Sequence, residues 1–87
     1  MNHRHRKVLH ALFAHPVSAN IDPKLVHAVF EELGAEVSHN GSGRVAVKLN
    51  GKAHAFHDTH HSLSKEEVVS IRTFLTEAGV DPAAYPA

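Results

Sequence analysis

At residues 44–57 the chain reads RVAVKLNGKAHAFH, and residues 44–49 alternate polar and apolar side chains as a half-buried strand does. The pair Asn50-Gly51 at its centre is a strong signal for a two-residue hairpin turn, because both positions of a type I′ turn require positive φ. Residues 52–57 therefore return as a second, antiparallel strand.

A two-residue turn also fixes which residues of the two strands lie opposite each other. It places Leu49 opposite Lys52, Val47 opposite His54, Val45 opposite Phe56 and Arg44 opposite His57. Because side chains alternate between the faces of a strand, one face is apolar, with His54 at its edge. The other, called the outer face below, is expected to carry Arg44, Ala46, Lys48, Ala53, Ala55 and His57.

The segments before the hairpin predict a third strand and a helix. Residues 35–39 form a short strand that leads into the turn sequence NGSG at residues 40–43. A helix precedes it, with Asp22 as the N-cap, Pro23 in the first turn and Gly34 at the end. Apolar residues recur on one face of this helix at Val26, Val29, Phe30 and Leu33.

Two further helices lie at the ends of the chain. Residues 3–14 predict a short basic helix with a narrow apolar face that ends before His15-Pro16. Ser64 and Glu67 have the spacing of a capping box before an apolar stripe that Gly79 closes. We therefore expect a single α+β domain over residues 1–87, in the order α-α-β-β-β-α, with the helices on one face of a three-stranded antiparallel sheet.

Composition limits the class of protein. The 87 residues include 43% hydrophobic and 21% charged residues and no cysteine, which excludes disulfide frameworks and thiolate chemistry. No run approaches the roughly 20 apolar residues that cross a bilayer, and no secretion signal follows the basic start. We expect a soluble cytoplasmic protein that does not bind membranes.

Charge is balanced overall, with nine basic and nine acidic residues, but it is distributed unevenly. No acidic residue occurs between Glu36 and Asp58, whereas Arg44, Lys48 and Lys52 all fall there. A positive strip with small alanines between the charges suits the phosphate backbone of RNA. These three basic residues are the predicted RNA-binding set, and an ordinary solvated strand face is the alternative.

Ten histidines are the unusual feature of the composition, and His57 is the best placed for chemistry. It is expected beside Arg44 and next to the polar loop DTHH at residues 58–61. One histidine acting as base, another as acid and an arginine that stabilises charge are enough for attack of a ribose 2′-hydroxyl on its phosphate. This route needs no metal and no cofactor.

Metal binding is a separate interpretation of the histidine run at His54, His57, His60 and His61. Metal ions need several ligands that converge on one point. In the predicted strand His54 and His57 point to opposite faces, which leaves too few ligands together. We therefore assign no metal site, and a histidine-rich metal-binding protein is the third interpretation of the sequence.

Several segments together resemble the HicA toxins over residues 7–82. They are FEELGAEV at residues 30–37, GSG at 41–43, RVAV at 44–47, NG at 50–51, FHDTH at 56–60 and FLTEAGV at 74–80. The resemblance implies a fold like that of double-stranded RNA-binding domains. It also implies an mRNA interferase of a type II toxin-antitoxin system and a neutralising HicB-like partner protein.

One departure from that family concerns catalysis. The usual catalytic histidine follows a Gly-Ser pair, but this chain reads Gly41-Ser42-Gly43-Arg44 there. The second histidine-containing stretch of the family matches residues 56–60, which points to His57 and His60 as catalytic residues, with Arg44 as phosphate anchor. Either catalysis has moved to His57, or the chain is a noncatalytic RNA-binding or protein-binding relative.

Overall fold

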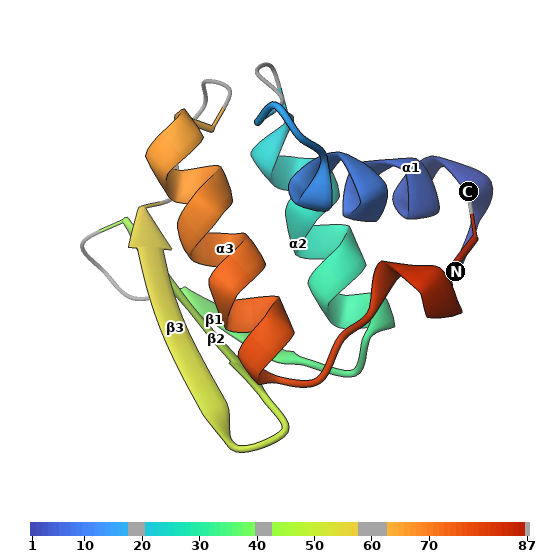
Figure 1. Ribbon diagram of the computed structural model, residues 1–87. Coiled ribbons are helices and arrows are strands. Elements are labelled where there is room, and N and C mark those ends of the chain that lie inside the picture. Colours follow the sequence, from blue (N-terminus) through green and yellow to red (C-terminus); the bar gives the residue numbers. More distant parts are fainter. Residues whose placement is uncertain (18–20, 40–42, 58–62, 87) are drawn as a thin grey trace.

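The computed structural model describes residues 1–17, 21–39, 43–57 and 63–86, with residue 57 described by its backbone alone (Figure 1). Its elements are α1 (His3–Phe13), α2 (Pro23–Glu32), β1 (Glu36–His39), β2 (Arg44–Leu49), β3 (Lys52–His57), α3 (Lys65–Glu77) and the 3₁₀ helix η1 (Pro82–Ala84). The predicted α+β class and the order α-α-β-β-β-α are confirmed. The short helix η1 was not predicted.

The sheet is antiparallel in the order β1-β2-β3, and the hairpin has the predicted register. Leu49 pairs with Lys52 at the turn, and Arg44 pairs with His57 at the far end. Asn50 and Gly51 have φ values of 51° and 81°, as a type I′ turn requires. The burial of β2 alternates strictly along the strand, so one of its faces belongs to the core and the other to solvent.

The helix ends follow the capping chemistry of the sequence. The Asp22 carboxylate accepts a hydrogen bond from the backbone N–H of Lys24 at the start of α2. At the start of α3, Ser64 and Glu67 form both hydrogen bonds of the capping box. Expected and observed ends of the elements differ by a residue or so; α1 ends at Phe13 and β1 begins at Glu36.

All three α-helices lie on the same side of the sheet (Figure 1). α2 contacts β1, α3 contacts β3, and α1 packs against both other helices. Side chains from every α-helix, from β2 and from β3 form one core, whose most deeply buried large residues are Leu9, Leu12, Val26, Val29, Phe30, Val45, Val47, Val68, Ile71 and Leu75. The opposite face of the sheet is left to solvent.

The described part of the chain contains no helix that combines the length and the apolar character needed to span a membrane.

Candidate nucleic-acid interface

The outer face of the sheet consists of the exposed, alternate residues of the three strands. β1 contributes Glu36 and Ser38, β2 contributes Arg44, Ala46 and Lys48, and β3 contributes Ala53 and Ala55. Ala46 lies between the two basic side chains on β2, Ala55 lies beside it on β3, and Ala53 lies beside Lys48. An elongated ligand can therefore approach the backbone closely here. The predicted exposure is confirmed for the five predicted residues whose side chains are described, and the His57 side chain is outside that set.

Charge on the outer face is less positive than the sequence indicates. Arg44 and Lys48 lie on it four residues apart along β2, which corresponds to about 13 Å. Glu36, the first residue of β1, is the register partner of Lys48. A carboxylate therefore lies beside Lys48 and offsets part of its charge.

The third predicted RNA-binding residue, Lys52, does not join the other two. It pairs with Leu49, whose side chain belongs to the core face, so the Lys52 side chain leaves the backbone on the core face and not on the outer face. The physical reason is the two-residue period of a strand, which separates Lys52 from Lys48 although both flank the same turn. The structure thus brings together Arg44 and Lys48 and leaves Lys52 apart.

Arg44 and His57 are cross-strand partners at the end of the hairpin distant from the turn. Directly opposite residues in an antiparallel pair have Cβ atoms about 4.5–5.5 Å apart, which is within reach for an arginine and a histidine acting on one phosphate. The His57 side chain and the whole of His60 lie outside the described residues. Of the predicted catalytic residues, the structure therefore describes Arg44 and the backbone position of His57 opposite it.

His54 lies on the core side of the sheet, as the register predicts. Its ring stacks on Phe74 with ring centroids 5.7 Å apart and on Phe56 at 6.2 Å. Partial burial lowers the pKa of His54 below its ordinary value, because desolvation disfavours the charged imidazolium. This histidine is a neutral packing residue at neutral pH. It lies on the face of β3 opposite to the outer face.

No group of three or more histidine or acidic side chains that could hold a metal ion occurs among residues 1–17, 21–39, 43–56 and 63–86. In the predicted histidine run, His54 is committed to the aromatic stack. His60 and His61 fall outside the described residues.

Four histidines outside the predicted catalytic set make specific contacts; they are His5, His10, His27 and His39. His27 is half-buried, with its ring 5.6 Å from that of Phe56 and 5.5 Å from that of His39. His10 Nε2 lies 2.8 Å from the carbonyl oxygen of Tyr85. Each of these contacts depends on a segment distant in sequence that no local pattern reveals.

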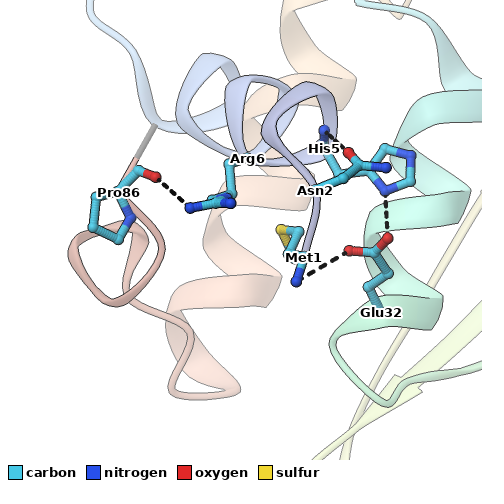
Figure 2. A network of polar contacts seen from close by, with 6 residues as sticks. All are labelled: Met1, Asn2, His5, Arg6, Glu32 and Pro86. Carbon is cyan, nitrogen blue, oxygen red and sulfur yellow. Dashed lines mark hydrogen bonds and ion pairs between the residues drawn. The ribbon is translucent and has the colours of Figure 1, made fainter.

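His5 belongs to a polar network at the start of α1 (Figure 2). Its Nδ1 lies 2.6 Å from a carboxylate oxygen of Glu32, and the Met1 amino group lies 3.9 Å from the other oxygen. Arg6 donates a hydrogen bond to the carbonyl oxygen of Pro86 on the neighbouring side of α1 (Figure 2). α1 is therefore attached by polar contacts to both α2 and the C-terminal segment.

Comparisons of the chain with protein-family models, with curated proteins and with solved structures found no match.

Proposed function

We propose that this chain is a HicA-like, toxin-type endoribonuclease that binds mRNA on the outer face and cleaves it without a metal ion. The observation that carries the proposal is the cross-strand pairing of Arg44 with His57 at the open end of an exposed face with small side chains. This backbone register supports the proposal, because directly opposite residues of an antiparallel pair lie close enough for one phosphate to meet a cation and an acid-base group.

Each residue has a defined part in the proposed reaction. His57 accepts the proton of a ribose 2′-hydroxyl, whose oxygen then attacks the adjacent phosphorus and forms a 2′,3′-cyclic phosphate. His60 gives a proton to the departing 5′-oxygen, and Arg44 stabilises the additional negative charge on the phosphoryl oxygens. Lys48 holds the phosphate chain further along β2.

A HicB-like antitoxin is the proposed protein partner, and the cytoplasm, where mRNA is present, is the proposed location. An acidic surface on such a partner would compete with RNA for Arg44 and Lys48 on the outer face. This competition accounts for inhibition without any change in the fold.

A noncatalytic RNA-binding module is the second candidate, and one observation favours it. Either Gly43 or Arg44, depending on how the turn is aligned, occupies the place of the usual histidine of HicA proteins. Loss of that imidazole without a replacement at His57 would leave a face that binds RNA and does not cut it.

Purified protein incubated with a mixed-sequence single-stranded RNA, with and without EDTA, tests the proposal. We expect discrete fragments that persist in EDTA. In His57→Ala, cleavage should fall at least about 100-fold, while RNA affinity changes by less than about twofold because the basic residues remain. His15→Ala, an exposed histidine outside the sheet, is the matched control and should cleave normally.

Other outcomes separate the candidates. Intact RNA that binds with salt-sensitive affinity would support the noncatalytic module. Full cleavage by His57→Ala would remove His57 from the mechanism, and cleavage abolished by EDTA would refute the metal-independent route.

A further inference from the structure

β3 is an edge strand of the sheet in the described part of the chain. In a two-residue hairpin the closing pair, here Leu49 and Lys52, is hydrogen-bonded, and hydrogen-bonded and non-hydrogen-bonded pairs then alternate along the strands. Ala53 and Ala55 fall in the non-hydrogen-bonded pairs with β2. Their backbone N–H and C=O groups therefore point away from β2, toward the free edge.

The usual devices that protect a free edge are missing from the middle of β3. Proline, a bulge or inward-pointing charges normally block the addition of another strand. β3 instead presents exposed alanines at positions 53 and 55, and the half-buried His54 between them. The edge is open to an extended peptide.

A groove runs beside this edge, between β3 and α3. It consists of two adjoining hollows of about 280 and 240 Å³, which share His54 and Ser70 in their walls. Val69 lines the first hollow. It is 43% exposed, more than any other large hydrophobic residue in the described part of the chain. An apolar side chain of a bound peptide therefore has a place to pack.

The charge of the groove indicates the chemistry of its occupant. Glu66 and Glu67 line one hollow and Glu77 lines the other, and no lysine or arginine lines either. His54 does not offset these carboxylates at neutral pH, because burial lowers its pKa. The groove therefore attracts a positively charged chain at both ends.

We propose that the β3 edge and the β3-α3 groove bind an extended, lysine- and arginine-rich segment of a partner protein, which adds to the sheet as a fourth strand. The backbone of the segment pairs with Ala53 and Ala55, an apolar side chain packs on Val69, and basic side chains meet the glutamates. A second copy of this chain is a poorer occupant, because a symmetric contact would place the carboxylates of two α3 helices against each other.

The groove lies on the helix side of β3, whereas Arg44 and Lys48 lie on the outer face, so the inference goes beyond the proposed function and does not depend on it. The peptide would pair with the backbone of Ala53 and Ala55, whose side chains belong to the outer face, and would leave Arg44 and Lys48 uncovered.

The test uses the ¹⁵N-labelled full chain and the peptide acetyl-Lys-Thr-Val-Thr-Lys-Thr-Arg-amide, in which Lys, Val, Lys and Arg share the face of the strand that meets the groove. We expect NMR shift changes at Ala53, Ala55, Val69 and Ser70, and slower hydrogen exchange of the Ala53 and Ala55 amides. The double variant Glu66→Gln, Glu77→Gln should weaken binding about three- to tenfold, as expected for two exposed ion pairs. Glu31→Gln, an exposed carboxylate on α2 outside the groove, is the matched control and should bind normally.

A second peptide isolates strand addition from charge. The same sequence with alternate backbone nitrogens methylated keeps its charge and loses its donors to the edge, so we expect at least about tenfold weaker binding to the unaltered protein. Equal binding of both peptides, or equal binding of a glutamate-for-lysine peptide, would overturn the proposal. Concentration-dependent dimerisation with the same shifts and no peptide would assign the edge to a second copy and refute the foreign segment.

Discussion

Asn50 in the hairpin turn donates its side-chain amide to the carbonyl oxygen of Ala78, the C-cap residue of α3, over 2.7 Å. The carbonyls of the last helical turn lack partners within the helix, so this contact satisfies one of them. The same residue holds the positive φ that the turn requires. Asn50 thus connects the sheet to the helix that borders the proposed peptide groove.

Two substitutions separate the contributions of Asn50. Asn50→Gly keeps easy access to positive φ and removes the hydrogen bond, so we expect the free energy of unfolding to fall by about 1 kcal/mol. Asn50→Ala removes the hydrogen bond and also strains the backbone, which should cost about 1 kcal/mol more. Urea denaturation measures both, and an alanine variant as stable as the glycine variant would contradict the role of φ.

Arg72 fixes α1 on α3. Its guanidinium donates hydrogen bonds to the carbonyl oxygens of Leu12 at 2.8 Å and Ala14 at 3.0 Å, at the end of α1. Arg72→Ala should lower the free energy of unfolding by about 1.5–3 kcal/mol, as charged hydrogen bonds to half-buried carbonyls do. Arg72→Lys retains the charge but not the two-pronged geometry, so it should recover part of that loss. Thermal unfolding of the two variants gives the comparison.

Glu32 holds the start of α1 through His5 and the Met1 amino group. Glu32→Gln should reduce the free energy of unfolding by about 0.5–1 kcal/mol, because these contacts are partly solvated. Amide hydrogen exchange should accelerate in the first turns of α1 and stay unchanged in β2. The neighbouring, exposed Glu31→Gln is the control, and equal effects of the two changes would show that the network does not hold α1.

Local patterns predicted most of this fold. The turn at Asn50 and Gly51 fixed the strand register, and the caps at Asp22 and Ser64 located two helices, because each signal depends on neighbours in sequence. Contacts between distant segments were not predictable in the same way. Nothing local indicates that His10 meets Tyr85.

The candidate site was predicted in part for the same reason. Alternation along β2 correctly grouped Arg44 with Lys48, and it also separates Lys52 from them. Glu36 lies beside Lys48 because of the register in which β1 pairs with β2. No two-residue turn determines that register, so the sequence did not predict it. The count of basic residues along the sequence therefore overstated the positive charge of the outer face.

The pKa of His54 provides a pH-dependent prediction. Because burial lowers this pKa in the folded state, the unfolded chain binds more protons between the lowered value and the ordinary value of about 6.5. The contribution of neutral His54 to stability is complete above about pH 6.5 and is lost as the pH falls toward the lowered pKa. His54→Leu should therefore lose less stability than the unaltered protein between about pH 7.5 and 5.5. His15→Leu in the exposed loop controls for the loss of one histidine, and parallel pH profiles of the His54 variant and the unaltered protein would refute the prediction.

Ala46 lies at the centre of the outer face, in register with Ser38 of β1 and Ala55 of β3. Ala46→Glu places a carboxylate between Arg44 and Lys48, where it repels phosphate and fills the space that the alanines leave. We expect RNA affinity at low salt to fall about five- to tenfold, and the difference from the unaltered protein to shrink as salt screens the charges. Lys24→Gln changes the net charge equally on exposed α2, away from this face, and should leave affinity within about twofold. If both variants bind RNA alike, overall charge and not the outer face governs binding, and the placement of the RNA site on the sheet fails.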